Sequence, residues 1–205
     1  MSKIDTTLSE QTVFQKRLSS VAESTLETIK LLFDMLQLRD KVTAKHSLSM
    51  AELSYQLAKE CDNRNAMLYY LGSLTHDIGK IGMHDKILKS NKALSPQERK
   101  SLHAHVEDGY NLLKKLNLPQ VILDISLYHH ERYDGSGYLL GLQGKEIPLA
   151  GRIAAITDTY SALTTNRPYQ RALNKQDALN IITKDSHMFD PEVLSIFLKL
   201  REREK

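Results

Sequence analysis

Residues 74–82 read LTHDIGKIG, an apolar segment that ends in a polar pair and is followed by two glycines. Neighbouring side chains on a helix are about 100° apart, so His76 and Asp77 can reach one cavity from its wall. An imidazole nitrogen and a carboxylate oxygen suit Fe, Mn or Zn, and a carboxylate can bridge two ions. Taken alone, such a pair is more often an ordinary helix end than a metal site.

Helical periodicity extends to both sides of this stretch, and strand alternation is nearly absent. Apolar residues recur at spacings of three and four in residues 14–36, 42–59, 66–78, 96–116, 119–130, 148–164, 175–183 and 191–201. Four prolines stand where a first helical turn accepts them, and Ser95 and Asp190 precede two of them as expected N-caps. Residues 131–147 hold four glycines and predict one structured loop. The sequence therefore predicts an all-α helical bundle with a long N-terminal helix and one glycine-rich loop.

The N-terminal helix of residues 14–36 carries no obvious chemistry. It is interpreted either as a dimerisation or signal-relay helix or, with more weight, as a helix packed on its own domain, because amphipathic helices usually bury one face locally. We expect residues 1–40 to form a helical extension and residues 41–205 to form the main domain.

Composition narrows the class of protein. The chain has 205 residues, 41% of them hydrophobic, which suffices for the core of one domain. Its net charge of +3 is spread without a basic block, so no nucleic-acid partner is expected. The single cysteine, Cys61, forms no intrachain disulfide. The polar N-terminus and the short apolar stretches predict a cytoplasmic chain with no membrane partner.

The other histidines and one aspartate fall on helix faces that can be assigned from periodicity. His46 continues into an apolar stripe and should point inward, and so should His105, whose stripe includes Gly109 and Leu113. His103 shares a polar face with Glu107 and is expected in solvent. The doublet His129-His130 closes an apolar helix directly before the glycine-rich loop, and Asp158 lies among alanines in another. A buried carboxylate without a partner is costly, so Asp158 should have one elsewhere.

For each of these residues singly, a core histidine or a helix-cap aspartate is the better interpretation. Together, five inward histidines and two inward aspartates would each need a separate buried partner. One shared dinuclear metal site would satisfy all of them.

The order of these motifs resembles the HD-GYP family of the HD-domain metal-dependent phosphohydrolases. The resemblance rests on His46, HDIGKIG, His105, the run His129-His130-Glu131, DGSGY at residues 134–138, Asp158 and RPY at residues 167–169. It covers about residues 45–198 and implies an HD-GYP phosphodiesterase domain at residues 41–205. It also implies hydrolysis of cyclic di-GMP to linear pGpG, GMP or both.

Carried over to this sequence, the resemblance implies particular residue roles. The implied metal ligands are His46, His76, Asp77, His105, His129, His130 and Asp158. Asp77 is the implied bridging and catalytic carboxylate, Lys80 is a catalytic and phosphate-binding residue, and Arg167 and Tyr138 bind substrate. The ligand types favour two divalent ions, Fe or Mn, with Zn, Ni or Co as alternatives.

The sequence departs from the family pattern at several positions. Leu139 replaces the proline of the Gly-Tyr-Pro signature, so altered loop mobility or partner contact is expected more than lost hydrolysis. Ser161 stands where a second aspartate is usual, Gln170 follows RPY, and Met83-His84 replaces an apolar-proline pair. Val42 occupies the position of the glutamate that members with a third metal carry, which predicts two metals.

Two alternatives stay open on the sequence. The same site could act on another cyclic dinucleotide, such as cyclic GMP-AMP, or on another nucleotide phosphoester. A catalytically silent module could instead bind a cyclic dinucleotide or a diguanylate cyclase (GGDEF) partner. A homodimer through the N-terminal helix is a further expectation. His84 and His187 are expected at the surface, and Asp134 with Gly135 is expected to form a turn.

Overall fold

The computed structural model describes residues 23–90, 92–166 and 171–203. These residues form helices and no strand, which confirms the predicted all-α class. The α-helices are α2 (Glu23–Arg39), α3 (Lys41–Cys61), α4 (Ala66–Thr75), α5 (Asp85–Leu88), α6 (Pro96–Leu113), α7 (Gln120–Tyr128), α8 (Leu149–Thr164), α9 (Lys175–Lys184) and α10 (Pro191–Arg203). Short 3₁₀ helices cover Asn63–Asn65, Ile78–Gly82, Lys114–Leu116, Gly144–Glu146 and Ser186–Met188.

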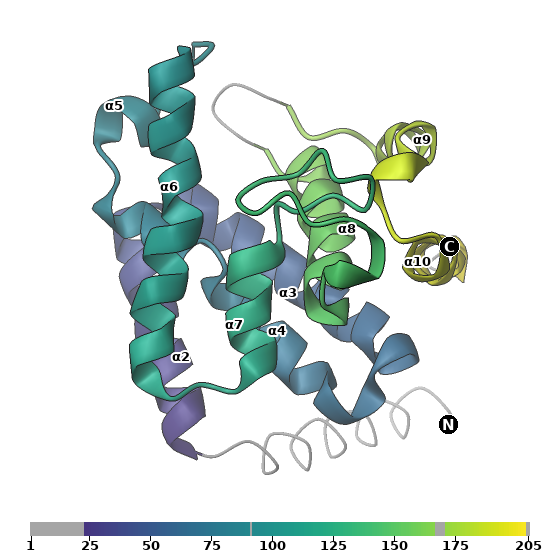
Figure 1. The fold of residues 1–205 in the computed structure, drawn as a ribbon, viewed down its shortest axis with the longest axis horizontal. Coiled ribbons are helices and arrows are strands. Elements are labelled where there is room, and N and C mark those ends of the chain that lie inside the picture. Colours follow the sequence, from purple (N-terminus) through teal and green to yellow (C-terminus); the bar gives the residue numbers. More distant parts are fainter. Residues whose placement is uncertain (1–22, 91, 167–170, 204–205) are drawn as a thin grey trace, which may run out of the picture.

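The helices form a bundle with α3 and α4 at its centre (Figure 1). Helix α3 contacts α4 and α8, and α4 and α8 both contact α7. Helix α6 packs on α7 and on the 3₁₀ turn Ile78–Gly82, while α9 and α10 lie beyond α8, away from α6. Every helix that carries a predicted ligand therefore borders the same interior.

Helix boundaries follow local capping chemistry. Asp40 accepts hydrogen bonds from the backbone nitrogens of Val42 and Thr43 and begins α3. Ser95 forms a capping box with Glu98 at the start of α6, as expected for this N-cap. Helix α4 ends at Thr75, so the predicted helix over residues 66–78 was too long. His76 and Asp77 lie in the turn that follows.

A close approach of two backbones explains why the chain turns there. A Cβ atom added at Gly79 would lie 2.1 Å from the carbonyl oxygen of His105 and 2.7 Å from the nitrogen of Gly109. No side chain fits in that space, so only glycine allows the 3₁₀ turn to lie directly on α6. This contact brings the segment after α4 against the helix that carries His105.

Helix α2 buries its apolar stripe inside this bundle. Ile29, Leu32 and Leu36 pack in one core cluster with residues of α4 such as Met67 and Leu71. The described part of the N-terminal helix thus packs on its own domain, which was the favoured interpretation of its amphipathic pattern. The boundary at residue 40 stays a prediction, because residues 1–22 lie outside the described ranges.

An ion pair fastens α10 to α8. The Arg152 guanidinium donates to the carboxylate of Asp190, whose other oxygen accepts from the backbone nitrogens of Glu192 and Val193. Asp190 therefore caps α10, as expected. Burial would raise the pKa of Asp190, but the hydrogen bonds from Arg152 and from the helix start hold it below its usual value.

We predict that Asp190→Ala lowers the free energy of unfolding by about 3–4 kcal/mol, because it removes the cap and leaves Arg152 unpaired. Asp190→Asn should lose less, since its amide oxygen can still cap. The ion-pair stabilisation is full above the ordinary pKa of an aspartate and is lost as pH falls through the lower folded-state pKa. Urea unfolding measures these differences, with the exposed Glu192→Ala as control. Equal losses for the Asn and Ala variants would contradict a capping contribution.

Candidate metal centre

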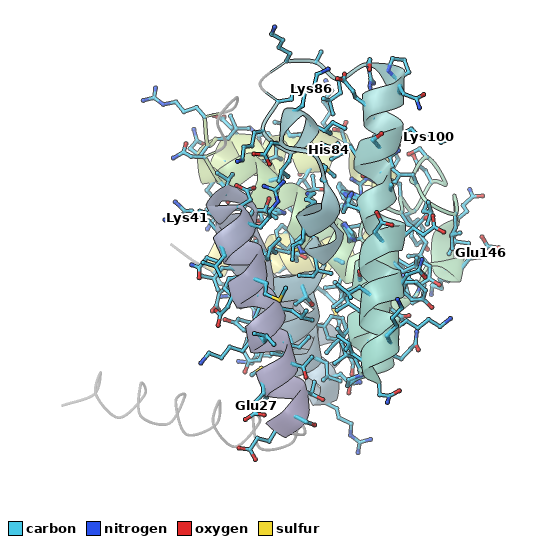
Figure 2. All side chains as sticks on the ribbon, turned by 90° about the vertical axis from the view of Figure 1, so that its left-hand side faces the viewer. Glu27, Lys41, His84, Lys86, Lys100 and Glu146 are labelled. Carbon is cyan, nitrogen blue, oxygen red and sulfur yellow. The ribbon has the colours of Figure 1, made fainter. Side chains whose placement is uncertain are left out.

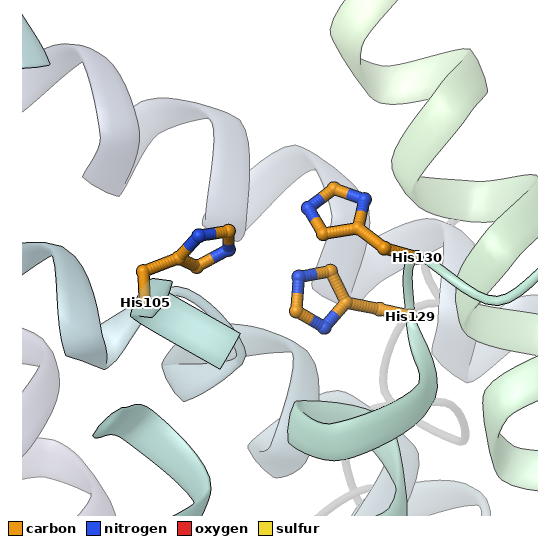
Figure 3. A group of neighbouring side chains, drawn as sticks. All are labelled: His105, His129 and His130. Carbon is orange, nitrogen blue, oxygen red and sulfur yellow. The ribbon is translucent and has the colours of Figure 1, made fainter. Parts of the chain in front are cut away.

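The seven predicted ligands meet in the interior of the bundle. Their ligand atoms form three overlapping groups in which all members lie within 4.8 Å of one another. The groups are His105, His129 and His130; His46, His76 and Asp158; and His76, Asp77 and His129. Figure 3 shows the rings of the first group pointing toward a common space from two sides. Helix α3, the turn after α4, α6, the end of α7, and α8 thus contribute to one cluster.

Three of these histidines are oriented in the same way. Each Nδ1 atom lies near a backbone carbonyl one turn earlier: 2.8 Å from Ser73 for His76, 2.5 Å from Leu102 for His105, and 2.9 Å from Ser126 for His129. A carbonyl oxygen can only accept, so Nδ1 carries the proton and Nε2 presents its lone pair to the interior. The three Nε2 atoms and Asp77 Oδ1 are buried without a hydrogen-bond donor. Unpaired acceptors facing one another are costly unless a cation lies between them.

The spacing of the acceptors fits shared ions. His46 Nε2 lies 2.8 Å from Asp158 Oδ1, and His105 Nε2 lies 3.1 Å from Asp77 Oδ1. The second oxygen of Asp77 lies 3.3 Å from His76 Nε2. Two ligand atoms about 2.1 Å from one ion and at a right angle to each other are about 3 Å apart. The two oxygens of Asp77 face different histidines, which is the arrangement that a bridging carboxylate requires.

Two imidazoles and one carboxylate of the cluster have the charge states of metal ligands. Burial, helped by neighbouring His76, lowers the pKa of His129 to about 3, and burial likewise holds the pKa of His130 well below its usual value. Burial would raise the pKa of Asp77, but the neighbouring His76 and Lys80 outweigh it and hold this pKa well below normal. Near neutral pH the carboxylate is ionised and these two imidazoles are neutral, as metal binding demands. Burial would lower the pKa of His76, but Asp77 and Asp158 outweigh it and raise this pKa, so this imidazole would release its Nε2 proton on binding a metal ion.

Lys80, which was predicted to bind phosphate, lies at the edge of the cluster. Its Nζ atom donates to Asp77 Oδ2 over 2.6 Å, and 18% of its side chain is exposed. The lysine therefore reaches the edge of the cluster with its charge directed inward. The other proposed phosphate ligand, Arg167, lies outside the described residues.

Ser161 supports a ligand from behind. Its hydroxyl donates to the backbone oxygen of His46 over 3.1 Å and lies 3.0 Å from His46 Nδ1, from which it can accept. This contact leaves Nε2 of His46 directed at Asp158. Ser161 stands where the family pattern usually has an aspartate, and here it orients a histidine of the cluster.

The glycine-rich loop lies against the cluster at His130. The Glu131 side chain is buried, and its carboxylate accepts from the backbone nitrogens of Leu140 over 2.7 Å and Leu142 over 3.0 Å. Tyr138 stacks on the ring of His130, with centroids 4.6 Å apart. The predicted substrate residue Tyr138 therefore lies next to the candidate ligands. Sequence reasoning gave Glu131 no task, because its partners are backbone nitrogens nine and eleven residues later in the loop.

The expectation that His103 is solvated was wrong. Its ring stacks on Tyr138 with centroids 3.7 Å apart and an interplanar angle of 9°. The polar face of α6 is covered here by a loop from 35 residues later, which periodicity within one helix does not reveal. His84 and His187 are exposed as expected, His84 near the start of α5 (Figure 2). Gly135 adopts a positive φ, and Asp134 accepts from Ser136 in the predicted turn.

Comparison with known proteins places the chain in a family. The model of the HD domain family matches residues 30–193. The chain belongs to the HD domain family. Phosphohydrolases of this family depend on metals, and the His and Asp groups described above are of a kind that binds them.

The relatives of this HD-domain chain include named phosphodiesterases. It is 35% identical over 181 residues to a cyclic di-GMP phosphodiesterase of Thermotoga maritima, covering 86% of this chain and 49% of the relative. It is 34% identical to the 3'3'-cGAMP-specific phosphodiesterase 1 of Vibrio cholerae, covering 86% and 43%. The predicted HD-GYP resemblance is confirmed by such relatives. The HD-domain chain spans about half the length or less of these curated proteins.

A solved structure shares the fold. The HD domain of the Listeria monocytogenes phosphodiesterase PgpH, in complex with cyclic di-AMP, superimposes with a TM-score of 0.63 at 22% identity. The match covers 83% of this HD-domain chain and 92% of that chain. Among the described residues, no helix is both long and apolar enough to cross a bilayer.

We predict that Mn²⁺ or anaerobic Fe²⁺ at about 100 times its dissociation constant raises the melting temperature by about 5–10 °C, because binding stabilises only the folded state. Asp77→Ala should abolish this increase, since the two oxygens of Asp77 face different histidines of the cluster. Thermal scans with and without a chelator measure it, and the surface variant His84→Ala should respond like the wild type. An undiminished increase in Asp77→Ala would contradict the shared role of this carboxylate.

Proposed function

We propose that this chain is a metal-dependent phosphodiesterase that hydrolyses cyclic di-GMP to linear pGpG, GMP or both. The observation that carries the proposal is the set of buried, mutually facing Nε2 and carboxylate atoms that lack donors. The cyclic di-GMP phosphodiesterases among its relatives support the substrate class.

We infer two divalent ions, and the two oxygens of Asp77, which face His76 on one side and His105 on the other, support this number. One ion would be held by His46, His76, Asp77 and Asp158, and the other by Asp77, His105, His129 and His130. Imidazole with carboxylate favours Fe or Mn, with Zn, Ni or Co as alternatives. Ions bound there would polarise the phosphoryl group and lower the pKa of water.

The other roles belong to side chains at the edges of the cluster. Lys80 would neutralise charge that grows on the phosphoryl oxygens, a role supported by its approach to Asp77. Tyr138 would contact the substrate from the loop, and Arg167 would bind phosphate with its two-pronged guanidinium. Cys61 is a poor nucleophile, since burial raises the pKa of its thiol to about 11.

A second substrate has specific support. Relatives in Vibrio cholerae named as 3'3'-cGAMP-specific phosphodiesterases are 32–34% identical to this chain. Cyclic GMP-AMP carries the same two phosphodiester bonds in one ring, so the same cluster would serve it. The choice between the two substrates would then depend on contacts to the bases.

We predict that anaerobically purified protein with two Fe or Mn ions per chain cleaves cyclic di-GMP faster than cyclic GMP-AMP. Chromatography of the products identifies pGpG and GMP and gives the rates. Lys80→Ala should keep its metals but lose at least about tenfold in kcat, because a charge-assisted contact to the phosphoryl group is lost.

Two different results would contradict the enzyme assignment and the role of Lys80. Two bound metals without turnover of either nucleotide would overturn the enzyme assignment and favour a binding module. A metal-free Lys80→Ala protein would contradict the role given to Lys80.

We also propose a homodimer, a diguanylate cyclase partner and a cytoplasmic location. Leu31, Met35 and Leu38 of α2 are exposed large apolar side chains on the face away from the core, which supports a homodimer through the N-terminal helix. A diguanylate cyclase partner and a cytoplasmic location rest on the sequence resemblance and on composition.

A further inference from the structure

A cavity of about 470 Å³ opens beside the candidate metal centre. His46, Asp77 and Lys80 line its inner end, and the segment from α5 to α6 forms its outer wall. This volume is in the range of pockets that hold small ligands. The cavity therefore gives a ligand at the metal centre room to extend toward α5.

The wall of this cavity combines apolar surface with cations. Val42, Ile87, Leu94 and Leu102 supply flat apolar surface of the kind that a nucleobase can cover. Lys80, Lys89 and Lys92 line the same cavity. We call this cavity the lysine pocket.

Two acidic residues line the lysine pocket: Asp77, which belongs to the candidate metal centre, and Asp40, whose carboxylate is already hydrogen-bonded. The carboxylate of Asp40 accepts from the backbone nitrogens of Val42 and Thr43 and, over 2.6 Å, from the Thr43 hydroxyl. It is also stabilised by the positive end of α3. The lysines are therefore the groups of this wall that remain available to an anion.

The lysine side chains can reach a ligand at small cost. Lys89 donates to Asp85 over 2.7 Å, but this pair is exposed, and Asp85 is also held by Arg39 over 2.6 Å. Exposed pairs of this kind contribute little, so an anion in the pocket can draw Lys89 away. Lys92 makes no ion pair with any residue that the structure describes.

We propose that the lysine pocket binds the half of the cyclic dinucleotide that is not being cleaved. The ring holds two phosphodiesters, so when one lies at the metal centre the other is carried a fixed distance away from it. In the lysine pocket this second phosphate meets Lys89 and Lys92, and its nucleoside covers the apolar wall. This inference rests on the proposed function and names the residues that select a two-phosphate substrate.

The test compares a two-phosphate and a one-phosphate substrate. The Lys89→Gln/Lys92→Gln variant should raise KM for cyclic di-GMP about tenfold or more, because charge-assisted contacts to a phosphate are lost. Its kinetics with bis(4-nitrophenyl) phosphate, which has a single phosphodiester, should stay within twofold of wild type. Lys86→Gln is the matched control, because this lysine of α5 lies three residues before Lys89, its side chain is 88% exposed (Figure 2), and it does not line the pocket.

The outcomes separate the two proposals. An unchanged KM for cyclic di-GMP, or an equal loss on both substrates, would overturn the role of the lysine pocket while leaving the enzyme assignment intact. Wild-type protein that cleaves neither substrate would overturn both.

A separate observation concerns the three stacked rings of His103, Tyr138 and His130. Tyr138 lies between the two histidines, with centroid distances of 3.7 Å to His103 and 4.6 Å to His130. The ring column joins α6 through the glycine-rich loop to a candidate metal ligand. Glu131 holds the other arm of the same loop through the nitrogens of Leu140 and Leu142.

We also infer that His103 is a positioning residue that holds Tyr138 over the metal centre. On the proposed function, His103→Ala should raise KM for cyclic di-GMP about two- to tenfold, the usual effect of losing one aromatic pair. His103→Phe should restore KM to within twofold of wild type, because stacking needs only a flat ring. Metal content should stay the same in both variants.

Steady-state kinetics and metal analysis measure these effects, with His84→Ala as a surface control. A Phe variant as impaired as the Ala variant, an unchanged KM in His103→Ala, or loss of metal in both would overturn the positioning role.

Discussion

The interior of this bundle must hold two carboxylates and five imidazoles where water cannot reach most of them. The protein supplies proton acceptors there without matching donors: Nε2 of His76, His105 and His129 and Oδ1 of Asp77 are all buried and unpaired. Backbone carbonyls take the Nδ1 protons and so fix the direction of the lone pairs. Positive charge among these acceptors offsets the cost of burying them, so we expect metal binding to add to the free energy of unfolding.

The surrounding architecture serves this arrangement. The candidate ligands come from α3, α6, α8, the turn after α4 and the two residues that follow α7, so no single element can build the site. The apolar stripe of α2 and the ion pair between Arg152 and Asp190 hold outer helices against this set. Close packing transmits small displacements, and ligand atoms about 3 Å apart leave little tolerance for them.

Much of the fold was readable from sequence because helical periodicity is a local property. Ser95 and Asp190 marked helix starts correctly, and the inward faces of His46 and His105 followed from their own helices. The errors arose where distant segments meet. Helix α4 ends at Thr75, before the turn in which Gly79 lies against α6, and His103 stacks on a loop residue that its own helix does not encode.

The sequence also did not predict the role of Glu131 or the short helix α5. Nothing in the spacing of Glu131 indicates that its carboxylate would hold two backbone nitrogens of the loop. Short α5 was missed because four residues are too few to display a helical period.

The contact at Gly79 limits which amino acids position 79 can tolerate. Its hydrogen atom faces the carbonyl of His105, and even a methyl group would push apart the two segments that hold Asp77 and His105 in register. A saturation library across residues 74–82 would accordingly return a single permitted amino acid at position 79. That position would look as invariant as a catalytic residue while contributing no atom to the chemistry.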